Sequence, residues 1–301
     1  MNNLFGVYLM MCSFALFFAG ESKASSISDR VDGLRNEGMG RSEAANFCAQ
    51  SVDPGAMVSC VASLRRESIT RSTAAKNCAK AYKPAAMASC VRGLRLESVT
   101  RDDSLAACAV SWEPGDLGSC VDGLRKEGIG RSTSLDFCKK SYQPGSLAGC
   151  VDALRREGLA RNAAAQSCSK SINPIHLGSC VDGLRGQGFS RDAAATACSQ
   201  SFAPQSFVSC VDGLRRTGFV RAEASSFCAK TFDPATLPSC VDGLRGEGFS
   251  RNEAAETCSQ ASAQQIPDLS GQPASCDVKR LTNCLRNFGG ITCFGQAGCR
   301  L

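Results

Sequence analysis

Apolar residues follow a helical spacing that recurs along most of the chain. Within residues 53–82, apolar side chains at positions 57, 60, 61 and 64 are spaced as on one face of a helix. Asp53 and Pro54 precede this stripe, and both residue types favour the first positions of a helix. Small and apolar side chains at Ala74, Ala75 and Cys78 predict a second helix over about 71–82. The stretch therefore predicts a pair of short helices.

The same pattern returns every thirty residues. Cysteines from Cys48 to Cys258 are separated by alternating gaps of 12 and 18, and valine, leucine and arginine keep the same period. Six of the eight units carry glycine between their two helices, where a left-handed residue commonly ends a helix. Tandem helical hairpins stack on their neighbours. We therefore predict an all-α fold, in which 30-residue αα-hairpins over residues 25–258 form a disulfide-stapled α-solenoid.

The two ends of the chain differ from this array. Residues 1–24 are expected to be a cleaved signal peptide, since the apolar run 4–19 is short for a membrane span and Ser22 and Ala24 suit a cleavage site. Residues 259–275 are predicted to be a linker rich in Ser, Gln and Pro. Residues 276–301 form a basic, cysteine-rich module that is expected to cap or dock. The protein is expected to be secreted, periplasmic or extracellular, where disulfides persist.

Composition limits the chemistry of the chain. It contains 20 cysteines but one histidine, so His176 cannot belong to a histidine metal cluster within one chain. We expect His176 to be solvent-exposed, because no nucleophile lies near it in the sequence and other units have no equivalent. We predict no catalytic residues, no resident metal and no cofactor.

The cysteine spacing favours bonds within each hairpin. Cys60 and Cys78 lie nine residues on either side of a turn near residue 69, so antiparallel helices would bring them level. The rival scheme joins Cys48 to Cys60 across the corner at Asp53, and the sequence leaves it open. Cys48 is expected to be free or intermolecular, as in a disulfide-linked dimer, because Arg30 occupies its partner's position. The cysteines expected in disulfides are Cys60, Cys78, Cys90, Cys108, Cys120, Cys138, Cys150, Cys168, Cys180, Cys198, Cys210, Cys228, Cys240, Cys258, Cys276, Cys284, Cys293 and Cys299.

Two arginine columns follow the period. Arg65 and its equivalents end the first helix, where a cation suits the helix dipole. Arg71 and its equivalents begin the second helix, where a cation needs a compensating partner; the Glu67 column and the acidic column of Asp122 are candidates for ion pairs between units. The alternative is an arginine ladder that binds an anionic polymer. Its candidate residues are Arg41, Arg71, Arg101, Arg131, Arg161, Arg191, Arg221 and Arg251.

These observations favour an exported, non-enzymatic scaffold. We expect one face of the solenoid to bind a protein or an anionic polysaccharide or surface, and no membrane span after signal cleavage. Nucleic acid is disfavoured, because aromatic residues are only 6% of the chain and leave little for base stacking. The first alternative is a thiol array that binds or stores copper. The second is a secreted hydrolase that uses scattered carboxylates.

Overall fold

The computed structural model describes residues 27–264, with side chains up to residue 260, and this part is all-helical as predicted. It contains sixteen α-helices and no strand. The first helices of the hairpins are α2 (Ile27–Asn36), α4 (Met57–Arg66), α6 (Met87–Leu96), α8 (Leu117–Lys126), α10 (Leu147–Arg156), α12 (Leu177–Gly186), α14 (Pro204–Arg216) and α16 (Leu237–Gly246). The second helices are α3 (Arg41–Gln50), α5 (Arg71–Lys80), α7 (Arg101–Val110), α9 (Arg131–Lys140), α11 (Arg161–Lys170), α13 (Arg191–Gln200), α15 (Arg221–Lys230) and α17 (Arg251–Gln264).

In five units the proline corner begins differently from the expectation. Asp53 accepts a hydrogen bond from the backbone N–H of Ala56 at 3.3 Å, as an N-cap does, but Pro54–Ala56 is a 3₁₀ turn and the α-helix starts only at Met57. Helix α14 instead runs continuously from Pro204. The proline therefore fixes the corner in both cases, because it lacks the donor that the first turn leaves unused.

The turn within each hairpin needs a left-handed residue. Gly38 has φ of 85°, and the equivalent glycines 128, 158, 188, 218 and 248 also have positive φ. In two units serine adopts the same conformation, with φ of 61° at Ser68 and 58° at Ser98. The glycine pattern in the sequence thus identified the hairpin turns correctly.

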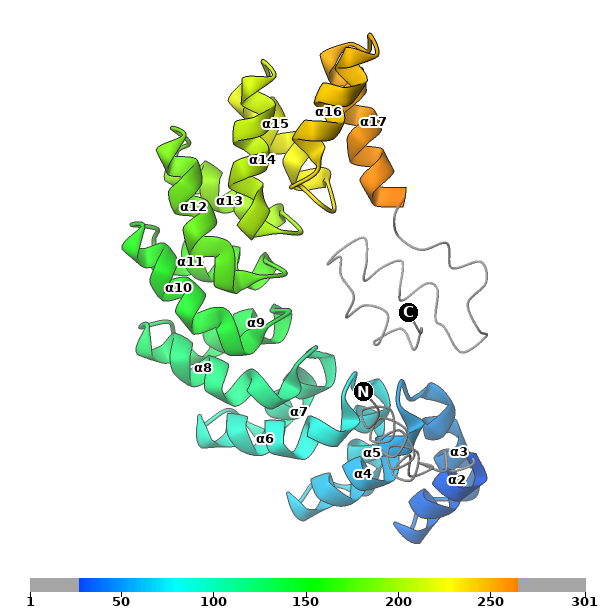
Figure 1. Cartoon of the computed structure of the whole chain (residues 1–301). Coiled ribbons are helices and arrows are strands. Elements are labelled where there is room, and N and C mark those ends of the chain that lie inside the picture. The colour runs from blue at the N-terminus through cyan, green and yellow to red at the C-terminus, as the bar shows by residue number, and fades with distance from the viewer. Residues whose placement is uncertain (1–26, 265–301) are drawn as a thin grey trace, which may run out of the picture.

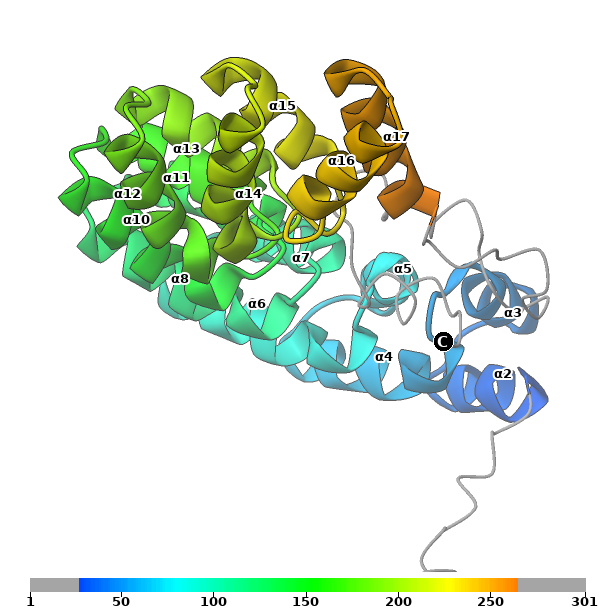
Figure 2. The ribbon, with the colours of Figure 1, turned by 45° about the horizontal axis from the view of Figure 1, so that its top comes forward.

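The hairpins stack into a curved array, seen as an open arc in Figure 1 and from a second direction in Figure 2. Each helix contacts its own hairpin partner and the corresponding helix of the next unit, which separates the even-numbered from the odd-numbered helices into two layers. In Figure 1, α8, α10 and α12 lie on the outer side of the arc, and α9, α11 and α13 face its interior. The odd-numbered helices therefore form the concave face.

The hydrophobic core is a narrow row of side chains between the two layers of helices. Cys60, Val61 and Leu64 of α4 are 2% exposed or less, and their equivalents are buried in the same way through α14. A row of large side chains closes the corners between units, where the rings of Tyr82 and Trp112 stack with centroids 4.2 Å apart. Helices of ten residues are marginal alone, so burial against neighbouring units has to hold them.

Disulfide bonds join the two helices of every complete hairpin, which confirms the favoured pairing and shows that the rival pairing across the corner is wrong. The Cα atoms of Cys60 and Cys78 are 6.0 Å apart, within the usual range for a disulfide. Closing a loop of this size contributes about 3 kcal/mol in the chain-entropy description. The seven bonds are 60–78, 90–108, 120–138, 150–168, 180–198, 210–228 and 240–258.

The last described helix is longer than expected. Helix α17 continues to Gln264, into the predicted linker 259–275. Gln264 occupies the column that holds proline in the earlier units, so the break that ends each earlier second helix is missing. The predicted signal peptide, the rest of the linker and the four cysteines of the C-terminal module lie outside the described residues.

Candidate binding groove on the concave face

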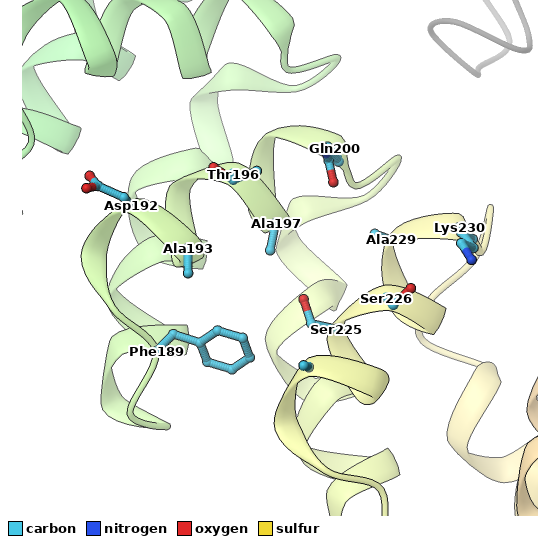
Figure 3. A pocket seen from close by; sticks show the side chains of 11 residues that line it. Phe189, Asp192, Ala193, Thr196, Ala197, Gln200, Ser225, Ser226, Ala229 and Lys230 are labelled. Carbon is cyan, nitrogen blue, oxygen red and sulfur yellow. The ribbon is translucent and has the colours of Figure 1, made fainter.

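A groove of about 720 Å³ lies between α13 and α15 on the concave face (Figure 3). Small side chains form most of its walls, and Figure 3 shows the ring of Phe189 pointing into the space between the two helices. Small walls allow close approach by another chain, while the ring offers an apolar contact. The lining residues are Phe189, Asp192, Ala193, Thr196, Ala197, Gln200, Ala222, Ser225, Ser226, Ala229 and Lys230.

The groove lies where the second helix carries a small residue in a column that holds phenylalanine in three of the eight units. In the following unit, Phe219 packs edge-on against Phe227, with ring centroids 5.5 Å apart, and is 4% exposed. The position equivalent to Phe227 is Ala197 in the groove unit, so Phe189 lacks this covering ring and stays partly exposed. The guanidinium of Arg221 lies over its ring, 5.5 Å from the centroid.

The two ends of the groove carry opposite charges. Asp192 is in the first turn of α13, whereas Lys230 ends α15, and both are exposed. Figure 3 shows these two side chains at opposite ends of the hollow. A bound helix would be favoured with its N-terminus near Asp192 and its C-terminus near Lys230, because a helix dipole is positive at its N-terminus.

A second hollow of about 590 Å³ lies between α15 and α17. It shares Ser226 and Lys230 with the first groove, so the two hollows adjoin. Glu223 and Glu256 make this part more acidic. The concave face is therefore hollowed across its last three helices.

The candidate anion-binding arginines mainly contact the neighbouring unit. Arg71 donates from Nη1 to the carbonyl oxygen of Gly38 at 2.7 Å, and Arg221 does the same to Gly188 at 2.8 Å. Arg101 and Arg251 donate to the carbonyls of Ser68 and Gly218. For these four arginines the compensating group is therefore a carbonyl of the preceding hairpin turn rather than the carboxylate that we expected. Within the described chain only Arg251 has a carboxylate in range, at 4.0 Å from Glu223.

Four carboxylates of the Glu67 column pair instead with the first arginine column, whereas Glu67 itself pairs with Arg92. Glu37 accepts a hydrogen bond from Arg65 of the next unit at 2.6 Å, and Glu97 accepts one from Arg125 at 2.7 Å. Glu127 and Glu157 pair in the same way with Arg155 and Arg185. Both arginine columns thus link successive units, and anion binding by the second column stays a prediction.

The remaining reactive side chains do not gather into a site. Cys48 is a free cysteine and 3% exposed, and burial raises the pKa of its thiol despite the opposing charge of Arg30. An interchain bond at Cys48 would require this buried sulfur to reach the surface. His176 is partly buried rather than fully exposed, and its backbone carbonyl accepts a hydrogen bond from Ser179 at 3.0 Å.

Residues 27–264 contain no cluster of side chains that could bind a metal ion. No group of three or more histidine, cysteine, aspartate or glutamate side chains is placed to hold an ion there. The fourteen sulfurs in disulfides cannot act as thiolate ligands. Along the same stretch, no helix combines the length and the apolar character that crossing a bilayer requires.

Comparisons with protein-family models, curated proteins and solved structures found no match to this chain. The function of the groove is therefore inferred from its geometry alone. The sequence analysis did not predict the groove, although the change from phenylalanine to a small residue is visible in the column that contains Phe47, Phe137 and Phe227. An alanine at position 197 in that column leaves room above Phe189.

Proposed function

We propose that this protein is an exported, non-enzymatic scaffold that binds a protein partner in the groove between α13 and α15. The observation that carries the proposal is the groove itself, with small walls, a partly exposed Phe189 and opposite charges at its ends. Recognition of an amphipathic helix by an apolar groove uses the same features. A large apolar side chain of the partner would cover Phe189.

A protein partner is favoured over an anionic polymer. Members of the arginine column that would form a ladder donate hydrogen bonds to carbonyls of the preceding unit. Binding an anionic polymer with those groups would compete with contacts that hold the array together. Export is supported by the seven disulfides, because such bonds persist mainly outside the reducing cytosol.

Groove filling tests the proposal. Ala197→Phe should place a ring against Phe189, as Phe227 does against Phe219, and so occupy the groove. Ser167→Phe is the matched control, since residue 167 holds the same column position on α11. Peptides would be selected from a displayed random library against the native protein and then measured on both variants.

We expect Ala197→Phe to weaken the selected peptides at least about 30-fold, as loss of a buried aromatic anchor does, and Ser167→Phe to leave them unchanged. Circular dichroism should be the same for all three proteins. Equal affinity for the native protein and Ala197→Phe would reject the groove as the binding site. Affinity that falls steeply with salt, and falls equally on both variants, would favour the arginine ladder instead.

A further inference from the structure

The C-terminal end of the array presents an unfinished interface. In most units before it, the apolar residue after the left-handed turn residue is buried; Ile129 is 4% exposed and Leu159 is 6% exposed, and Phe189 is a partly exposed exception. Phe249 holds this position in the last unit and is 47% exposed. Leu244 is partly exposed although its equivalents are fully buried, and Cys240 is exposed. These three residues form the end face.

Polar groups of the last unit are also left without the partners that earlier units have. The carbonyl of Gly218 receives a hydrogen bond from Arg251, whose guanidinium also lies over the ring of Phe219, 4.8 Å from its centroid. Among the described residues, a Cβ built on Gly248 would meet no atom within 4 Å apart from its chain neighbours, and no arginine there takes the place that Arg251 has at Gly218 and Phe219. Within residues 27–264, the last turn therefore lacks the arginine that the turns at Gly38, Ser68, Gly188 and Gly218 receive.

Among the described residues, Glu247 also lacks the arginine partner that its equivalents have. The equivalent carboxylates of Glu97 and Glu127 are paired with arginines of the following unit, at 2.7 and 2.5 Å. Within the described part of the chain no such arginine reaches Glu247, because Ser275 stands where it would be. A complementary surface must thus supply apolar side chains for Phe249 and Leu244, and cations for Glu247 and the Gly248 carbonyl.

The chain itself contains a segment with this chemistry, beyond the described residues. Residues 277–288 carry Lys279, Arg280 and Arg286 against one acid, Asp277. Apolar residues at 278, 281, 285 and 288 recur with helical spacing. In addition, Leu285–Gly289 reads LRNFG, which differs at one position from LRNEG at Leu34–Gly38. The segment resembles part of a repeat unit.

We propose that residues 277–289 dock on the end face and close the array as a degenerate ninth unit. The chain between α17 and residue 277 is long enough to reach back to the end face. Helix α17 carries the chain about 20 Å from the turn at 1.5 Å per residue, and the twelve residues between Gln264 and Asp277 can span up to about 40 Å. The docked segment would bury Phe249 and Leu244 and supply cations to Glu247 and the Gly248 carbonyl.

Trypsin cleavage after Lys279, Arg280 and Arg286 in the full-length, oxidised protein tests this docking. Cleavage would be followed by mass spectrometry after quenching and reduction. Phe249→Asp should release the segment and speed its cleavage at least ten-fold, and so should Glu247→Lys. The controls are Ile175→Asp, at a side chain 66% exposed and far from the end face, and Glu43→Lys, at an exposed carboxylate of α3. Both should cleave at the native rate.

Equal cleavage rates in the native protein, Phe249→Asp and Glu247→Lys would overturn the proposal. A native dimer that Phe249→Asp converts to monomer, seen by light scattering, would overturn it too, because a second copy would then cover the face. Circular dichroism must show that both variants keep the native helix content. Neither result depends on the groove between α13 and α15, so this test and that of the proposed function can fail separately.

Discussion

The Nη1 atom of Arg71 lies 2.7 Å from the carbonyl oxygen of Gly38 and joins the second helix of one hairpin to the turn of the hairpin before it. The carbonyl belongs to the left-handed turn residue that follows α2, so the contact gives this turn a hydrogen-bond donor from the next hairpin. It also offsets the unfavourable position of a cation at the start of α5. Stacking in this array is thus held by arginine–carbonyl contacts as well as by apolar packing.

Removing this arginine should weaken the coupling between units. We expect Arg71→Ala to lower the free energy of unfolding by about 1 kcal/mol, less than a buried charged hydrogen bond because the side chain is exposed. Arg66→Ala, an exposed arginine at the end of α4, should change it by less than about 0.5 kcal/mol. Urea denaturation followed by circular dichroism measures both. Equal effects would show that the carbonyl contact contributes nothing.

The serines with positive φ offer a stabilising change. Ser68→Gly should raise the free energy of unfolding by about 0.5–1 kcal/mol, because it removes the steric cost of a left-handed Cβ. Glycine should also let Arg101 approach, since its bond to the Ser68 carbonyl is 3.3 Å long whereas that of Arg71 to Gly38 is 2.7 Å. Ser59→Gly in the first turn of α4 should instead cost about 0.5 kcal/mol. Destabilisation by Ser68→Gly would contradict this reasoning.

A disulfide can be introduced into the first hairpin, whose Cys48 is free. Arg30 stands where the other hairpins have cysteine, opposite Cys48. Arg30→Cys should form a disulfide between position 30 and Cys48, so that thiol titration of the unfolded protein finds no free thiol in this unit. The gain should be about 3 kcal/mol over Arg30→Ser, which loses the same arginine but closes no loop. Two free thiols in oxidised Arg30→Cys would show that the first hairpin has a different geometry.

Tyr142 should ionise at a higher pH than an exposed tyrosine does. Burial, with a smaller contribution from the carboxylate of Glu113, raises the pKa of its phenol to about 12. The folded protein therefore keeps this proton where the unfolded chain releases it, and stability falls as pH rises from about 10 to 12. Ultraviolet absorbance of tyrosinate should show a step near pH 12 that Tyr142→Phe removes. The same step at pH 10 would mean that Tyr142 is exposed.

The sequence predicted the helical hairpins, their turns and the pairing of their cysteines, because each depends on short-range spacing. It did not predict where the arginine columns would bind, since both columns reach into the neighbouring unit across 28 or 33 residues. The groove was missed for a related reason. It depends on the small side chain of Ala197, whose effect shows only once α13 and α15 lie side by side. The extension of α17 depended on a missing proline at position 264.

The pairing within hairpins is the central claim, because these bonds hold an array with a thin core. Trypsin digestion without reduction, followed by mass spectrometry, tests it directly. No lysine or arginine lies between Cys198 and Cys210, so both fall in the peptide 192–215. We predict that this peptide appears only joined to the peptides that carry Cys180 and Cys228. Peptide 192–215 alone, with an internal bond, would contradict the account.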